Sequence, residues 1–213
     1  MFNTRIARVG AALALVMALS LSPRVVDDAI TGVVDPCNSS ASSAAGVLFA
    51  CPAGDGDQLA AGGLTINVTI LDNVSAPVPG VLASDIWVVG CADLLVLCGG
   101  SGAISASGPT DANGQTTITG DLAAGGCDGA LRVVWSGMVI GAGVCGQPCL
   151  PIQVRSADIN GSLYINLVDF AAFGAGYTSP PKPYNACIDY TAPFGTVTLP
   201  DFAKYGAHNN HTC

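Results

Sequence analysis

Six oxygen-bearing residues in the last third of the chain have the spacing of a cation-binding loop. Counted from the first of them, they occupy positions 1, 3, 5, 7, 9 and 12 of a twelve-residue segment: Asp158, Asn160, Ser162, Tyr164, Asn166 and Asp169. Ca²⁺ takes six to eight oxygen ligands, and a loop of this length supplies them from alternate residues, with a backbone carbonyl at position 7 and a bidentate carboxylate at position 12. The spacing therefore predicts a calcium site in which Tyr164 contributes its carbonyl and Asp169 contributes two oxygens.

The end of this loop belongs to a ten-residue phrase that occurs twice. Residues 165–174, Ile-Asn-Leu-Val-Asp-Phe-Ala-Ala-Phe-Gly, return as residues 197–206, Val-Thr-Leu-Pro-Asp-Phe-Ala-Lys-Tyr-Gly. Such a repeat marks a duplicated structural unit. The corresponding oxygen-bearing residues of the second copy are Asp189, Thr191, Thr198 and Asp201. This second loop carries one extra residue and lacks side-chain oxygens at Pro193 and Phe194, so we expect it to bind calcium weakly or not at all.

Residues 154–206 resemble a type I dockerin module, in which two calcium loops are each followed by a short helix and position 12 is Asp. The chain contains no Glu, so the EF-hand version of the loop, which ends in Glu, is not open to it. The resemblance implies a small helical, calcium-binding module over residues 153–213. One departure from the pattern is Leu163 at position 6, where a Gly normally makes the sharp turn. The alternative interpretation of the first loop is a turn rich in Asn and Gly that only precedes a helix.

The first twenty residues are typical of a secretory signal peptide. Arg5 and Arg8 precede an apolar run over residues 9–19, which is shorter than the ~20 residues that a bilayer span requires. We expect cleavage after Ser20, with a retained membrane anchor as the alternative. Loss of the two Arg changes the formal net charge from −8 to −10. A secreted or surface-attached chain this acidic, with no later membrane span, is not expected to bind nucleic acid.

Nine cysteines in an exported chain predict disulfides with one cysteine left over. Local loop closure predicts these pairs: Cys37 with Cys51, Cys91 with Cys98, Cys127 with Cys145 or Cys149, and Cys187 with Cys213. Zinc is the alternative explanation, with Cys145, Cys149, His208 and His211 as its ligands. No second close pair of cysteines completes a tetrahedral site, so the sequence favours disulfides.

Residues 62–152 are predicted to form an immunoglobulin-like β-sandwich, which makes the chain mainly β. Residues 64–70 alternate apolar and polar side chains with period two, as a half-buried strand does. Further strands are predicted over residues 46–51, 85–90, 94–98, 115–120 and 131–140, separated by Gly, Pro, Asn and Asp clusters. The segment Pro77-Val-Pro-Gly-Val81 and the later Asn113-Gly114 turn resemble bacterial immunoglobulin-like and prealbumin-like repeats. That resemblance implies a spacer, an adhesin or a building block without chemistry of its own.

The predicted organisation has four parts: a signal peptide over 1–20, an N-terminal arm or linker over 21–61, the β-sandwich over 62–152 and the dockerin-like module over 153–213. Catalytic residue types are scarce in all of them. The two histidines, His208 and His211, both lie in the last six residues, and no Gly-x-Ser-x-Gly nucleophile motif is present. Most Asp residues stand in turn contexts, where hydrogen bonds to the backbone explain them. We therefore do not expect an enzyme.

We expect instead a secreted structural protein that assembles with copies of itself into an extracellular fibre or surface layer. Only 10% of the residues are charged, which favours contact with other surfaces. In dockerins that bind cohesins, loop positions 10 and 11 carry the recognition side chains. In this chain they are Leu167 and Val168 in the first loop, and Leu199 and Pro200 in the second. Apolar pairs suit a permanent, packed contact. One alternative is docking to a cohesin-bearing scaffold, and another is a small secreted hydrolase or carbohydrate-binding module.

Overall fold

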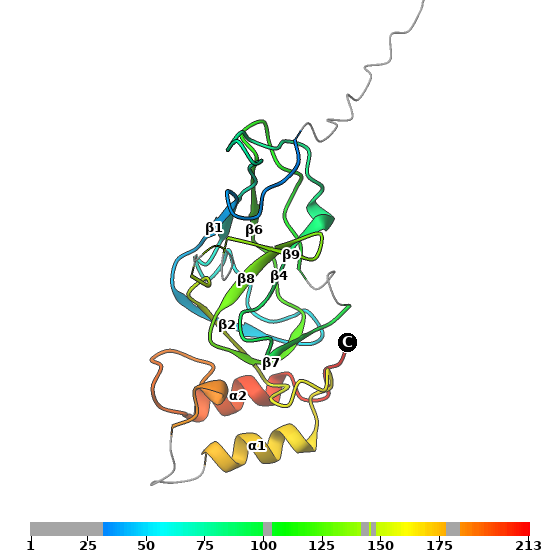
Figure 1. Ribbon diagram of the computed structural model, residues 1–213. Coiled ribbons are helices and arrows are strands. Elements are labelled where there is room, and N and C mark those ends of the chain that lie inside the picture. Colours follow the sequence, from blue (N-terminus) through cyan, green and yellow to red (C-terminus); the bar gives the residue numbers. More distant parts are fainter. Residues whose placement is uncertain (1–31, 100–103, 142–144, 146–147, 178–183) are drawn as a thin grey trace, which may run out of the picture.

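The computed structural model describes residues 32–99, 104–141, 145, 148–177 and 184–213. The expected signal peptide and residues 21–31 of the expected arm lie outside these described residues, so both remain expectations. Figure 1 shows strands over most of the described chain and two helices, α1 and α2, lying together at one end of it.

Strands are the main elements of the chain, and the expectation of a mainly β protein is confirmed. The strands are β1 (Ser40–Ser42), β2 (Gly46–Ala50), β3 (Ile66–Thr69), β4 (Ile86–Gly90), β5 (Leu95–Leu97), β6 (Gln115–Ile118), β7 (Ala124–Asp128), β8 (Leu131–Trp135), β9 (Met138–Ile140) and β10 (Ile152–Ser156). The helices are α1 (Leu167–Tyr177) and α2 (Leu199–Ala207), with short 3₁₀ turns η1 (Ala83–Asp85) and η3 (Ala186–Ile188).

The strands form three sheets around a shared apolar core. Their orders are β1-β3-β6, β2-β10-β7-β5 and β4-β8-β9. All pairings are antiparallel except that of β10 with β2, which is parallel. In β3, Ile66 and Val68 point into the core while Asn67 is exposed, as the period-two pattern predicts. The arrangement is consistent with a β-sandwich of the immunoglobulin-like kind.

Two strands differ from the expected pattern because of glycine. Residues 131–140 are a hairpin and not a single strand, since Ser136 and Gly137 adopt φ values of 46° and 87° and reverse the chain between β8 and β9. Two successive residues with positive φ are typical of the tight turns that join antiparallel strands. Strand β7 was not expected, because Gly125 and Gly126 weaken any strand pattern. Both glycines are needed there, since a Cβ at Gly125 would overlap the Asp158 carboxylate and one at Gly126 would overlap the Leu94 carbonyl.

The described part of the expected arm, residues 32–61, belongs to the sheets. Strand β1 pairs with β3, strand β2 pairs with β10, and Val34 is buried in the core. Strand β10 begins at Ile152, the last residue of the expected sandwich, and continues past the expected boundary to Ser156. The sandwich therefore starts before residue 62 and ends after residue 152, because edge strands β1 and β2 from one side of the expected domain and interior strand β10 from the other complete its sheets.

A second buried cluster attaches the helices to the sandwich. It combines Phe49 of β2 with residues of the helical region: Ile165, Phe173, Ile188, Tyr190 and Tyr205. The rings of Phe49 and Tyr190 meet edge to face with centroids 5.1 Å apart, and Phe173 stacks on Tyr205 at 5.2 Å. Such ring pairs contribute about 0.5–1.5 kcal/mol beyond the burial of their area. The helices are therefore packed against the end of the sandwich through a core of their own.

Disulfides are present, but every predicted pairing is wrong. The four bridges are Cys37–Cys145, Cys91–Cys149, Cys98–Cys213 and Cys127–Cys187, which join residues 58 to 115 positions apart. Cys51 is the cysteine left over, and it is buried. The disulfide partners are cysteines whose segments lie close together in the folded chain. Cys127 of β7, for example, pairs with Cys187 in η3 of the helical region. Four disulfides suggest an oxidising, extracellular environment. Among the described helices, neither length nor hydrophobicity is sufficient for one to cross a bilayer.

Candidate metal centre

The first predicted calcium loop leaves the sandwich directly from the end of β10. Asp158 follows that strand by two residues, and its carbonyl accepts a hydrogen bond of 2.7 Å from the N–H of Gly126 in β7. The carboxylate of Asp158 lies against Gly125, which has no space for a Cβ. Position 1 of the loop is therefore fixed by two strands of the sandwich before the loop itself begins.

The turn at the middle of the loop forms around Asp158. Its Oδ1 accepts the N–H of Ser162 at 3.0 Å, and its Oδ2 accepts the N–H of Leu163 at 2.7 Å. Leu163 has a φ of 62°, the left-handed conformation that favours glycine. Leu163 thus makes the sharp turn despite its Cβ, and the departure from the expected Gly does not change the course of the loop.

The other predicted ligands converge at the start of α1. Asp169 accepts the N–H groups of Asn160 at 3.2 Å and Asn166 at 3.0 Å. The Tyr164 carbonyl, expected to be a ligand, accepts the Ser162 hydroxyl at 3.1 Å and the Asn166 amide at 3.0 Å. The structure therefore brings all the predicted residues of the first loop into one hydrogen-bonded turn.

The electrostatics of this loop suit a divalent cation. Asp158 and Asp169 are both fully buried, and neither forms an ion pair within the described part of the chain. Burial raises the pKa of Asp158, and the nearby charge of Asp169 raises it further, against the hydrogen bonds from Leu163 and Ser162. Buried carboxylates are normally paired with a cation or coordinate a metal. The donor set, made only of carboxylate, carbonyl, amide and hydroxyl oxygens, fits Ca²⁺.

The second predicted loop uses its position-12 carboxylate for another purpose. Oδ1 of Asp201 accepts hydrogen bonds from the N–H of Tyr190 at 2.7 Å and from the N–H and hydroxyl of Thr191 at 2.8 Å. Oδ2 accepts the N–H of Thr198 at 2.7 Å and its hydroxyl at 2.8 Å, which completes a capping box at the start of α2. Burial raises the pKa of Asp201, but these hydrogen bonds outweigh it and the net shift is downward. Five hydrogen-bond donors of the chain therefore occupy the carboxylate oxygens of Asp201 that would otherwise bind a metal ion.

An arginine also faces the second loop. The buried guanidinium of Arg155, from β10, donates to the carbonyl of Asp189 and lies 3.8 Å from its Oδ2. It also packs 4.8 Å from the centre of the Phe194 ring. The same Oδ2 accepts the N–H of Gly195 at 2.6 Å and the Tyr184 hydroxyl at 2.5 Å. A cation of the chain itself thus stands beside position 1, which favours the expectation of weak calcium binding there. Sequence reasoning missed this role of Arg155, which is 34 residues from Asp189.

The two helices carry five exposed large apolar side chains, together called the helix face here. They are Leu167, Val168 and Phe170 in α1, and Leu199 and Phe202 in α2. Leu167 and Leu199 are equivalent positions of the repeat, as are Phe170 and Phe202. Leu167 is 78% exposed and Leu199 is 70% exposed. The rings of Phe170 and Phe202 lie 6.4 Å apart. A groove of about 420 Å³ runs between these rings and the residues that follow α2.

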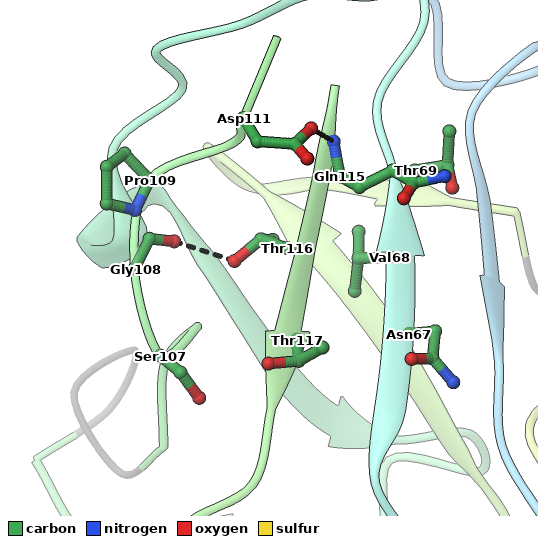
Figure 2. Close-up of a pocket in the computed structure, with 10 residues that line it drawn as sticks. All are labelled: Asn67, Val68, Thr69, Ser107, Gly108, Pro109, Asp111, Gln115, Thr116 and Thr117. Carbon is green, nitrogen blue, oxygen red and sulfur yellow. Dashed lines mark hydrogen bonds between the residues drawn. The ribbon is translucent and has the colours of Figure 1, made fainter. Parts of the chain in front are cut away.

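A second groove crosses the sandwich beside β3 and β6, and Figure 2 shows its lining of Thr, Ser, Asn and Gln side chains. Its carboxylate, Asp111, already accepts the backbone N–H groups of Asn113 at 2.8 Å and Gln115 at 2.9 Å. These hydrogen bonds, that of Gln115 first, lower the pKa of Asp111. The carboxylate therefore stabilises the turn before β6 and is poorly suited to act as a base.

The zinc alternative based on Cys145 and Cys149 is wrong. Both cysteines are in disulfides, with Cys37 and Cys91 respectively. A disulfide sulfur has no thiolate to offer a metal.

Comparison with known proteins adds little to this geometry. No family model matches the chain, and no curated protein matches it. A solved structure described as the "Crystal structure of the Lin-41 filamin domain" is similar over 55% of this chain and 95% of that chain. The two are 17% identical with a TM-score of 0.28, a likeness too weak to support an inference.

Proposed function

We propose that this protein is a secreted structural protein that assembles with copies of itself into an extracellular fibre or surface layer. The observation that carries the proposal is the helix face. Large apolar side chains gathered on one surface normally mark a contact with another protein. The dockerin-like repeat supplies that face twice, from equivalent positions of two copies.

Calcium in the first loop would order this face. Asp169 is position 12 of the loop and also lies in the first turn of α1. Leu167, Val168 and Phe170 lie within two residues of it in the chain. Two buried carboxylates, Asp158 and Asp169, repel each other in the absence of a cation, which loosens the start of α1. Metal binding and the order of the contact surface are therefore linked.

The sandwich carries exposed apolar residues that can meet the helix face of a neighbour. They include Val33, Leu82, Leu94, Val96 and Met138. A contact between two different surfaces of identical molecules propagates into an open fibre unless its rotation closes a ring. The low content of charged residues, 10%, supports such packing because little charge has to be desolvated.

Docking to a different protein, such as a cohesin-like scaffold, is the alternative use of the same face. Experiments on the purified protein without any partner distinguish docking from self-assembly. Self-assembly predicts large species in light scattering and fibres or sheets in negative-stain images at micromolar protein in millimolar calcium. Excess chelator should reduce both. A protein that stays monomeric in both conditions would overturn the proposal and favour docking.

Two variants test whether the helix face makes the contact. Leu167→Ser removes the most exposed residue of the face and should reduce assembly. Val74→Ser is the matched control, because Val74 is 74% exposed but lies in a turn of the sandwich. Equal assembly of both variants would exclude the helix face as the contact surface.

The calcium part of the proposal has its own test. Asp169→Ala removes the residue expected to provide two ligands and should abolish calcium uptake by the first loop in calorimetry. Unchanged calcium uptake by this variant would contradict the ligand assignment, whatever the state of assembly.

A further inference from the structure

Four side chains that are distant in the sequence form a compact cluster beside α2. Cys51 follows β2 and Asp55 lies in the next turn, while His208 ends α2 and His211 lies in the tail after it. One donor atom from each of the four falls within 4.8 Å of all the others. No part of the calcium loops described above contributes to this cluster.

Three of the separations are close to those of ligands around a single tetrahedral ion. Cys51 Sγ is 3.5 Å from His211 Nδ1, and His208 Nδ1 is 3.5 Å from Asp55 Oδ1. His211 Nδ1 is 3.1 Å from Asp55 Oδ2. Zinc lies about 2.0–2.3 Å from nitrogen, oxygen and sulfur ligands, so tetrahedral geometry places neighbouring ligand atoms roughly 3.3–3.8 Å apart.

One of the donors lacks the partner that burial would demand. His208 Nδ1 is buried and makes no hydrogen bond within the described chain, although it points toward Asp55. A buried imidazole nitrogen without a partner has lost the hydrogen bond that water supplies in the unfolded chain. An ion at the centre of the cluster would satisfy this nitrogen. Cys51 is also fully buried, and it is the one cysteine of the described chain outside the disulfides.

A catalytic Cys-His-Asp arrangement does not fit these contacts. In such a triad one imidazole nitrogen faces the nucleophile and the other faces the carboxylate. In this cluster Nδ1 of His211 faces both Cys51 and Asp55. Convergence of all donors on one point is the geometry of a metal site.

We propose that Cys51, Asp55, His208 and His211 bind one Zn²⁺ ion, which ties the turn after β2 to the C-terminal tail. Thiolate and imidazole ligands select zinc over calcium, whose ligands are oxygens. Four protein ligands close the coordination sphere, so the role is structural.

The surrounding structure holds both halves of the site in place. The carbonyl of Cys51 accepts the N–H of Gly54 at 2.9 Å, and the carbonyl of His211 accepts the N–H of Ile165 at 2.9 Å. The His208 ring packs 4.9 Å from the ring of Phe49. Supporting contacts of this kind fix ligand orientation before a metal arrives.

The test is zinc titration of the purified full chain in millimolar calcium, which occupies the oxygen sites first. Calorimetry after removal of metals should give one zinc per chain. Cobalt(II) should give the absorption of a tetrahedral thiolate complex, and Cys51→Ser should lose the thiolate band. His211→Gln and Asp55→Asn should each weaken zinc binding by more than ~100-fold. Loss of a residue that only supports a ligand weakens metal affinity by at most about that factor.

Asp57→Asn is the matched control, since Asp57 lies two residues from Asp55 but pairs with Lys204 at 2.8 Å. This variant should bind zinc as the wild type does. Absence of zinc binding in the wild type would overturn the proposal. Wild-type zinc affinity in both His211→Gln and Asp55→Asn would also overturn it. These two side chains are partly exposed, so both variants should fold, and the test does not depend on whether Cys51→Ser folds.

Discussion

Replacing Gly125 with Ala is expected to weaken calcium binding by the first loop. A Cβ at this position would overlap the Asp158 carboxylate and lie 2.7 Å from its Cγ. Carbon atoms in contact are normally about 3.5–4.0 Å apart, so the carboxylate must move by about 1 Å. That movement breaks its 2.7 Å hydrogen bond from the N–H of Leu163.

The magnitude follows from that hydrogen bond. A hydrogen bond to a charged group contributes about 1.5–3 kcal/mol. The calcium-bound loop needs the Asp158 carboxylate in place, whereas the empty loop can relax, so most of this loss falls on the bound state. At about 1.4 kcal/mol per factor of ten, the calcium affinity should fall by about 10- to 100-fold.

Calorimetric calcium titration measures this change, with Gly129→Ala as the control. Gly129 follows β7 directly, and a Cβ there meets nothing within 4 Å. The control should bind calcium as the wild type does. If folded Gly125→Ala bound calcium as tightly as Gly129→Ala, then Asp158 would not be a ligand in the arrangement described.

The remaining predictions concern the second loop and the cysteines. Arg155→Met should lower the free energy of unfolding by about 3–5 kcal/mol, because Asp189 is left buried without its cation. Denaturant unfolding in the presence of chelator measures this change. If calcium restored the lost stability, the second loop would bind metal, contrary to our expectation. Peptide mapping under non-reducing, denaturing conditions should find one alkylated thiol per chain, at Cys51, and a peptide that links Cys127 to Cys187; a free thiol elsewhere would contradict the connectivity.

The sequence predicted the turn of the first loop because its information is local. Alternate oxygen side chains within twelve residues are visible as a pattern, and the period-two alternation that identified β3 is equally local. The six residues lie in one hydrogen-bonded turn, with Leu163 in the conformation of the missing Gly, and their role as calcium ligands stays a prediction. These features depend on neighbours in the chain, so a single sequence contains them.

The features that the sequence did not predict share one physical cause, because they depend on contacts between segments that are distant in the chain. Gly125 and Gly126 have no strand propensity, and only the approach of Asp158 and Leu94 explains why β7 needs them. Disulfide partners are chosen by the ends of strands that meet in the folded chain, which spacing does not record. The role of Arg155 depends on β10 lying beside the second loop.

The cysteine and histidine cluster was equally hidden. Cys51 and His211 are 160 residues apart, so no motif spacing joins them. The available signal was compositional: an odd cysteine, together with two histidines close to each other. From the sequence these features indicate only an unpaired cysteine and a zinc alternative with Cys145 and Cys149, since nothing local connects Cys51 to the histidines.

The parallel pairing of β2 with β10 limits how this chain can be made and divided. Strand β10 lies between β2 and β7 in its sheet, so β2 has no partner among the described strands until residues 152–156 have been synthesised. Contacts this distant in sequence slow folding, because a long loop must close before they form. A truncation before residue 152 would remove an interior strand and expose two edges. Any division of the sandwich from the helical region must therefore fall after residue 156.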